Sequence, residues 1–291
     1  MTFRIGNIMK KKRSIYLLAL LPFLVLTVMY EIIPLIGVVI SSFISDENGA
    51  VTAANYGTVF SKLLYQKAMQ NSLKISTLSS LAGILIAFLG ARSYYEKRGK
   101  LGQIFMTILN MVSNFAGIPL AFAYMILLGN AGVMVQLGRK MGIDALANFN
   151  LYSSNGMTFM YIYFQIPLAT LLLIPAFDGI RKEWQEAALL LGAGKGTFWL
   201  KVGIPVLMPS ILSTFSVLFA NALAAYATAY ALMMNMLPLL PIQIAGCFVG
   251  DVKMQRGLGG ALSVVMMLMM VVMIFITNTI SRRFQKGEAV K

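Results

Sequence analysis

The sequence predicts an all-α integral membrane protein with six transmembrane helices and both termini in the cytoplasm. Of its 291 residues, 58% are hydrophobic and only 12% are charged, and the mean hydropathy is +0.78. A water-soluble domain of this size does not need so large an apolar share. Uncharged runs long enough to cross a bilayer recur along the chain, and the basic residues gather between alternate runs.

Six apolar runs are candidates for the transmembrane helices, because a helix needs about 20 apolar residues to cross roughly 30 Å of hydrocarbon. They lie between Arg13 and Asp46, at Ile75–Ala91, within Leu101–Gly138, Ala145–Phe177 and Val202–Gly250, and at Gly257–Ser281. Only the first of them contains a charge, Glu31. The first run follows a basic cluster, as in a signal peptide, but it is too long for a signal core and has no small-residue cleavage site. We therefore expect a retained first helix.

The distribution of lysine and arginine indicates the number and direction of the crossings, because cytoplasmic loops carry an excess of basic residues. With the N-terminus inside, 17 of the 24 basic residues fall in cytoplasmic segments and seven fall outside. The fifth run is long enough for two crossings, but a seventh span would place the basic cluster at Arg282 and Arg283 on the outer face. Six spans are therefore expected, with the segment around Pro238 and Pro241 as an outer loop or a half-inserted turn.

Composition disfavours several functional classes. The chain has no histidine and one cysteine, Cys247, so it lacks the usual proton-transfer residue and the commonest metal ligands, and neither a metal site nor a cofactor is expected. A membrane-embedded enzyme is disfavoured, although composition leaves a Ser–Lys pair open. The net charge of +14 arises from the loops of a multi-span protein. Nucleic acid is therefore not an expected partner, whereas membrane lipid is.

The most informative segment lies between the fourth and fifth spans. Trp184, Ala187, Ala188 and Leu191 follow the i, i+3, i+4, i+7 spacing of one apolar helix face, which predicts a short amphipathic helix at about 181–196. Three glycines, at 192, 194 and 196, are expected to end it, because glycine tolerates a left-handed turn. Docking into a cleft of a partner and lying flat on the membrane surface both fit this periodicity.

The full spacing of this segment resembles the "EAA" signature of the membrane subunits of ATP-binding-cassette importers that depend on a substrate-binding protein. The segment reads Glu186-Ala187-Ala188, three residues, Gly192, nine residues, and then Val202-Gly203-Ile204-Pro205. The family pattern ends in Ile-x-Leu-Pro, so Val202 and Ile204 are conservative departures. The position between the third-last and second-last spans also agrees with the family, and the resemblance covers nearly the whole chain.

This resemblance implies a type I importer permease fold in the bacterial cytoplasmic (inner) membrane. It implies that ATP and Mg²⁺ bind to a separate cytoplasmic ATPase subunit, and that this chain is not itself an enzyme. Further expected partners are a second homologous permease and an extracytoplasmic substrate-binding protein. The residues implied to couple to the ATPase are Glu186, Ala187, Ala188, Gly192, Val202 and Pro205.

Within this family, three segments are most similar to permeases of the polyamine, ferric-iron and phosphonate type, namely Asn71–Lys74, Asn114–Pro119 and Leu237–Gln243. The implied solute is a polyamine or another small charged molecule. The expected organisation is a basic cytoplasmic segment at 1–13, the first helix and an outer loop at 14–70, a five-helix core at 71–281 that includes the coupling helix at about 181–196, and a cytoplasmic tail at 282–291.

Polar residues within the spans are candidates for lining a solute pathway, because polar groups that face lipid are costly. Asn114, Gly117 and Pro119 are expected near mid-membrane, where proline removes a backbone hydrogen bond and glycine permits a bend. Asn221 and Tyr226 lie in a polar stretch of the fifth run. Packing between helices is the alternative for such residues, and for the two asparagines both interpretations stay open.

Glu31 is the only acid within an apolar run, and it is expected near the outer end of the first helix. It could contact a cationic solute as part of the pathway, or it could be solvated or paired structurally. A secondary transporter or channel that works without ATP is the alternative function. Such a carrier would be expected to have several intramembrane ionisable groups, which these runs do not contain.

Overall fold

The computed structural model describes residues 20–96, 99–234, 236–249 and 254–289. Within these ranges the chain is helical, apart from loops and one antiparallel bridge between Ile44 and Val51. Six helical stretches are long and apolar enough to cross a membrane: Leu20–Ser42, Leu63–Glu96, Ile118–Met141, Ser154–Phe177, Lys195–Ala224 and Arg256–Phe284. The predicted six transmembrane helices are therefore confirmed in the described part of the chain, while the side on which each end lies stays a prediction.

Three of these stretches are divided into shorter helices, two of them at a π-helical turn, and further short helices lie between the stretches. The segments are η1 (Val28–Ile32), α2 (Ile33–Ser42), α3 (Ala54–Ser61), α4 (Leu63–Glu96), α5 (Lys100–Ser113), α6 (Ile118–Leu128), α7 (Val133–Met141), α8 (Asp144–Ala147), α9 (Ser154–Phe177), α10 (Lys182–Leu190), α11 (Lys195–Phe198), η2 (Trp199–Gly203), α12 (Ile204–Ala224), α13 (Tyr226–Met233), α14 (Leu240–Phe248) and α15 (Arg256–Ala289). α13 and α14 are too short to cross a bilayer. Among the described residues around Pro238 and Pro241, the predicted absence of a seventh span is thus confirmed.

The contacts divide the chain into two compact units. The first comprises residues up to Val59 together with Cys247–Val264, and the second comprises Phe60–Gly246 with Val265–Lys291. Within the first unit, the Asp46 carboxylate accepts hydrogen bonds from the backbone N–H groups of Gly257 (2.7 Å) and Leu258 (3.1 Å), so it caps the first turn of α15. The division predicted from the sequence stays a prediction, and its basic segment 1–13 lies outside the described residues.

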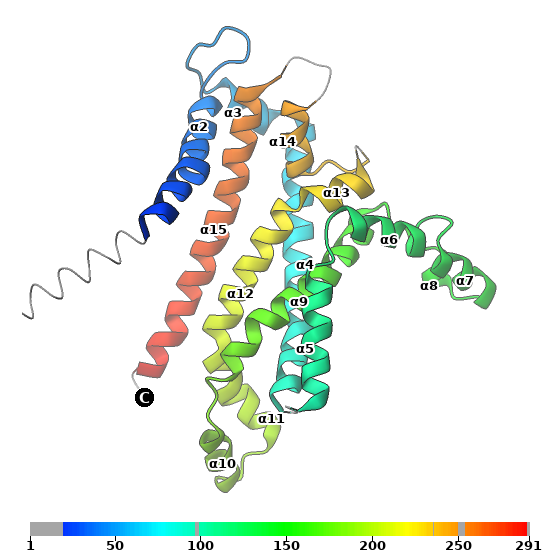
Figure 1. Ribbon diagram of the computed structural model, residues 1–291, viewed down its shortest axis with the longest axis vertical. Helices are drawn as coiled ribbons and strands as arrows, with labels where there is room; N and C mark the ends of the chain where they lie inside the picture. Colours follow the sequence, from blue (N-terminus) through cyan, green and yellow to red (C-terminus); the bar gives the residue numbers. More distant parts are fainter. Residues whose placement is uncertain (1–19, 97–98, 235, 250–253, 290–291) are drawn as a thin grey trace, which may run out of the picture. The chain divides into compact units, whose positions relative to one another are not determined.

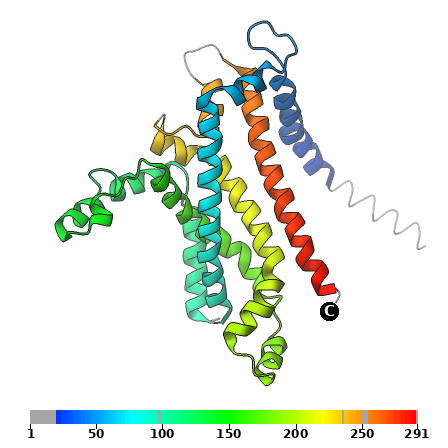
Figure 2. The same ribbon diagram turned by 180° about the vertical axis from the view of Figure 1, so that it is seen from behind.

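The second unit is built on α4, α9 and α12, which pack along one another (Figure 1). α4 has 34 residues and is therefore about 51 Å long at a rise of 1.5 Å per residue. It begins at Leu63, well before the predicted start of the second span at Ile75, because the helix continues past the hydrocarbon on at least one side. Figure 2 shows α4 from behind, running beside α5.

The buried side-chain amide of Gln165 forms hydrogen bonds that connect these three helices. Gln165 of α9 is fully buried, and its side-chain nitrogen donates to Ser80 Oγ of α4 (3.1 Å) and to the backbone oxygen of Leu218 in α12 (2.8 Å). Gly83 of α4 faces the same residue, and a Cβ placed there would lie 2.8 Å from the Cβ of Gln165. The core therefore depends on a close approach of α4 to α9 that only glycine permits.

The third predicted run is interrupted at its glycine and proline. α5 ends at Ser113, and α6 begins after Gly117, whose φ is 74°. Pro119 lies in the first turn of α6, where its missing N–H leaves no hydrogen bond unmade. The predicted bend is confirmed as a break in the helix, and α6 runs in a different direction from α5 (Figure 1). The apolar stretch Ile118–Met141 starts at this break, and the predicted position of the break near mid-membrane stays a prediction.

Candidate functional site

The predicted amphipathic helix between the fourth and fifth spans is α10, and it ends in a well-defined turn. Gly192 has a φ of 76°, the backbone N–H of Gly192 donates to the oxygen of Leu189 (3.0 Å), and that of Ala193 donates to the oxygen of Ala188 (2.9 Å). This pair of bonds is the Schellman motif, which satisfies carbonyl groups at a helix end and needs a left-handed residue. Gly192 therefore ends the helix, as predicted.

The other two glycines of this segment have different roles from the one predicted. Gly194 has a φ of −67° and precedes α11, and Gly196 lies within α11. Neither needs a left-handed conformation, and a side chain at either position would meet no atom within 4 Å. The expectation that all three glycines end the helix is therefore wrong for these two, because one left-handed residue is enough to complete the turn.

The two sides of α10 line two different pockets of the second unit: a cavity on one side and a groove on the other. Glu186 lines a cavity of about 900 Å³, which also includes Tyr95, Asp178 and Trp199. The opposite, apolar face lines a groove of about 780 Å³ between α10 and the ends of α12 and α15. The groove contains Ala187, Ala188, Val202 and Pro205. The structure thus brings four of the six predicted coupling residues together in the groove, and it places Glu186 on the other side of the helix.

No residue of α10 is buried. Glu186 and Ala187 are exposed, and Leu190 is 89% exposed although it is apolar. Ala188 is half-buried because it packs against the apolar cluster that includes Phe177 and Trp199. The helix is therefore anchored to its own chain along one edge and open on the rest of its surface, including the glutamate side.

The segment that follows α10 is held by a buried tryptophan. Trp199 opens the π-helical turn η2 and is 5% exposed. A Cβ on Gly203 would lie 2.4 Å from a ring carbon of Trp199, so glycine at this position allows the indole to pack against the backbone. Pro205 lies in the first turn of α12, where proline is favoured. The structure thus explains two residues at the Val202–Pro205 end of the signature: Gly203 leaves room for the indole, and Pro205 starts α12.

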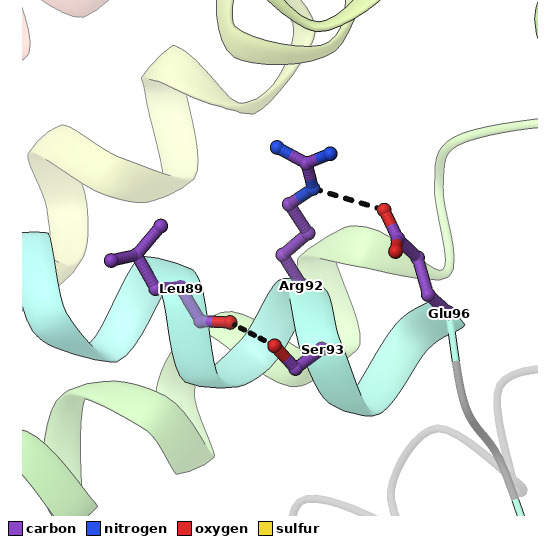
Figure 3. A network of polar contacts seen from close by, with 4 residues as sticks. All are labelled: Leu89, Arg92, Ser93 and Glu96. Atoms are coloured by element: carbon purple, nitrogen blue, oxygen red, sulfur yellow. Dashed lines mark hydrogen bonds and ion pairs between the residues drawn. The ribbon is translucent and has the colours of Figure 1, made fainter. Parts of the chain in front are cut away.

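Arg92 links the end of α4 to this tryptophan, a contact that sequence reasoning missed. Its guanidinium carbon lies 4.6 Å from the centroid of the Trp199 ring, and its Nε lies 3.0 Å from Oε1 of Glu96. Figure 3 shows this ion pair beside the bond from Ser93 Oγ to the backbone oxygen of Leu89 (2.9 Å). An arginine above an indole face is attracted by the ring's electrons.

A second bond joins the same two regions, because the hydroxyl of Tyr95 donates to the backbone oxygen of Ile180 at 3.0 Å. The end of α4 therefore contacts the chain both just before and just after α10. No sequence pattern reveals these contacts, since the partners are about 85 to 107 positions apart in the chain.

The predicted pathway residues of the second unit gather where two helices are interrupted. α12 ends at Ala224, α13 begins at Tyr226, and α13 packs against α6. A Cβ on Gly117 would lie 4.0 Å from that of Ala227, so the break before α6 adjoins the break before α13. Tyr226 stacks on Tyr230 with ring centroids 5.3 Å apart.

Three polar side chains near these breaks are accessible. Asn114, Asn221 and Tyr226 are all exposed. The Asn114 side chain donates to the backbone oxygen of Asn110 (2.7 Å), which closes the end of α5. Their role in a pathway stays a prediction, although broken helices often surround the solute sites of transporters.

Glu31 belongs to the first unit and lies in η1, exposed. The helix continues for eleven residues beyond it, to Ser42, which corresponds to about 16 Å. The expected position near the end of the helix is therefore wrong. Among the described residues, no group of three or more histidine, cysteine, aspartate or glutamate side chains could hold a metal ion.

The fold and site define a multi-span α-helical membrane protein with an exposed amphipathic helix between its fourth and fifth spans. The chain belongs to the family described as "Binding-protein-dependent transport system inner membrane component", which it matches over residues 79–288. The resemblance to importer permeases drawn from the sequence is thereby confirmed, and the homologues below are permease subunits of transport systems.

Two curated relatives illustrate the family. The thiamine transport system permease protein ThiP of Escherichia coli is 25% identical over 53% of this chain, and the match spans only 28% of that protein's length. A probable sulfate transport system permease protein, cysT of Prototheca wickerhamii, is 25% identical over 74% of this chain and 81% of its own.

The fold matches a solved importer. A bacterial ABC transporter involved in the import of the acidic polysaccharide alginate is 18% identical, with a TM-score of 0.74 over 96% of this chain and 99% of the matched chain. The predicted fold of an ABC importer permease is therefore confirmed.

Proposed function

We propose that this chain is the transmembrane subunit of an ATP-driven solute importer of the bacterial cytoplasmic membrane, with both termini in the cytoplasm. It forms half of the translocation pathway and couples to a separate ATPase through α10. The observation that carries this proposal is α10 itself: a capped, exposed helix inside the family-matched region. A short helix with an apolar edge on its own chain and an open remainder is suited to receive a partner.

α10 transmits motion because it is fastened at both ends to the membrane helices. The aromatic contacts of Trp199 with Arg92 and Phe177, and the Tyr95–Ile180 bond, connect its flanks to α4 and α9. Displacement of α10 by the closing ATPase would therefore move the ends of these long helices. ATP and Mg²⁺ bind to the ATPase subunit, and this chain supplies the helix that the ATPase moves.

The second homologous permease and an external substrate-binding protein complete the proposed assembly. The family's description as binding-protein-dependent supports the latter. The solute crosses between the two permeases, and in this chain the adjoining helix breaks at Gly117 and Ala225 lie near Asn114, Asn221 and Tyr226 in the sequence. Glu31 of the first unit is a further candidate for contact with a cationic solute.

We propose further that the solute is small and charged. Thiamine, sulfate and the acidic polysaccharide alginate are named as the solutes of related systems, and all three are ions. Their charges differ in sign, so they do not indicate the sign of this chain's solute. The narrower prediction of a polyamine rests on the similarity of the segments Asn71–Lys74, Asn114–Pro119 and Leu237–Gln243 to permeases of that type. It is tested by competition with labelled polyamine uptake in cells that carry the complete system.

Two glutamates of α10 provide the test of coupling. Glu183 and Glu186 are both exposed and lie one turn apart. We expect Glu186→Lys to abolish co-purification of the ATPase and solute uptake, because the reversed charge lies at the proposed contact. The matched variant Glu183→Lys should keep most of both activities, and both variants should insert normally. Normal uptake by Glu186→Lys would overturn the proposal.

A further inference from the structure

The groove on the apolar side of α10 combines apolar walls with two basic residues. The proposed contact of α10 with an ATPase does not account for these basic residues. Its walls come from α10, the start of α12 and the end of α15, and they include Trp184, Leu191, Val202, Pro205 and Phe284. Two basic residues, Lys201 and Arg283, complete the lining, and among the residues that the structure describes no acidic one lines the groove. An apolar cleft with two cations at its edge matches an amphiphile with an anionic head.

The groove also has the size and openness of a binding site. Its volume of about 780 Å³ lies within the range of roughly 300–1,000 Å³ that is typical of ligand sites. Trp184 is 38% exposed and Leu191 is 87% exposed, although both are apolar. Apolar surface of this kind is covered in most proteins by a partner or a ligand.

The position of the groove indicates which amphiphile is present. α12 and α15 belong to two stretches that are long and apolar enough to span the membrane, and the groove lies at the ends of these stretches, at Lys201–Val206 and Arg283–Phe284. Because the ends of membrane-spanning helices lie near the lipid headgroups, we expect the groove at that level. Basic residues at this depth attract anionic lipids, by about fivefold in affinity for each residue.

We propose that this groove binds an anionic phospholipid of the surrounding membrane. The phosphate lies against Lys201 and Arg283, and the upper part of one acyl chain lies on Trp184, Val202 and Phe284. This site shares Ala187, Ala188, Val202 and Pro205 with the residues predicted to couple, and it rests on the proposed function in that the ATPase then contacts α10 on the Glu186 side. The lipid would occupy the space between α10 and the spans while the ATPase contacts the remainder of α10.

Tryptophan fluorescence provides a direct test, because the chain has only two tryptophans. Trp184 lines the groove, whereas Trp199 is buried in the core. The full chain is reconstituted in phosphatidylcholine nanodiscs that contain a minor fraction of either brominated phosphatidylglycerol or brominated phosphatidylcholine. We expect severalfold stronger quenching by the anionic lipid, a preference that weakens as salt is raised.

Two sets of variants test whether the stronger quenching by the anionic lipid arises in the groove. Lys201→Gln with Arg283→Gln should make the two brominated lipids quench equally, and Trp184→Phe should remove the preference. The matched control, Arg139→Gln with Lys140→Gln, removes the same two residue types from the exposed end of α7 and should keep it.

Equal quenching by the two lipids in the wild-type chain would overturn the proposal. So would an equal loss in the control variant, which would indicate general attraction by the protein's charge. Loss of the preference when the ATPase binds would also overturn it, because the groove would then belong to that partner.

Discussion

α9 and α10 are neighbours in the chain, yet they are stabilised in opposite ways. Half of the residues of α9 are buried, including Gln165, and the helix contacts both α4 and α12. α10 buries none of its nine residues. α9 is therefore stabilised by contacts within its own chain, whereas most of the surface of α10 stays accessible to a partner. The difference separates a helix that packs within its own chain from one whose surface is available to the partner proposed above.

The largest effect is expected in the frame, at the closest approach of α4 to α9. Gly83→Ala should destabilise the chain by about 2 kcal/mol, because its Cβ would lie 2.8 Å from that of Gln165 and the helices must separate. Gly90→Ala on the same helix is the control, since its Cβ would meet neighbours only at 3.5 Å or beyond. Thermal stability in detergent, followed by size-exclusion chromatography, measures both. Equal melting temperatures would show that α4 and α9 are not held at this distance.

A smaller, local effect is expected at the end of α10. Gly192→Ala should cost about 1–2 kcal/mol for the left-handed backbone alone, because the space around it is open. The global melting temperature should hardly change, but amide hydrogen exchange at Ala193 should become about tenfold faster as the last turn opens more often. Gly194→Ala, at a φ of −67°, should leave this exchange rate unchanged. If both variants exchange alike, the turn does not depend on Gly192.

The smallest effect concerns the contact between the two regions. Arg92→Met should destabilise the folded chain by about 1 kcal/mol, because it loses the stacking on Trp199 and the pair with Glu96. Glu96→Gln removes only an exposed i, i+4 pair and should cost no more than about 0.5 kcal/mol. Chemical denaturation compares the two, followed by Trp199 emission in chains that also carry Trp184→Phe. A larger loss in Glu96→Gln would contradict the importance of the cation–indole contact.

The sequence predicted these regions unequally for physical reasons. Hydropathy located the spans, the left-handed turn at a helix end identified Gly192, and the combination of a glycine and a proline predicted the bend at Gly117 and Pro119. Glu31 was placed too close to the end of its helix, because charge alone does not show where a helix ends. The contacts of Gln165 and Arg92 were missed, since they join residues far apart in the chain. An amide in an otherwise apolar run was the available signal for Gln165.

The two faces of α10 were also beyond prediction from periodicity. The spacing identified the apolar face, but it did not show that Ala188 packs on the protein's own core while Glu186 faces a separate cavity. Only the path of η2 and α12, which return beside α10, decides which side of the helix stays open.

Site-specific photo-crosslinking in the complete transporter tests the central claim most directly. A photoreactive amino acid at position 186 should crosslink to the cytoplasmic ATPase, and one at position 140, at the exposed end of α7, should not. The account predicts a strong ATPase adduct at 186 that disappears when the ATPase is omitted. Adducts at 186 with lipid alone would contradict it.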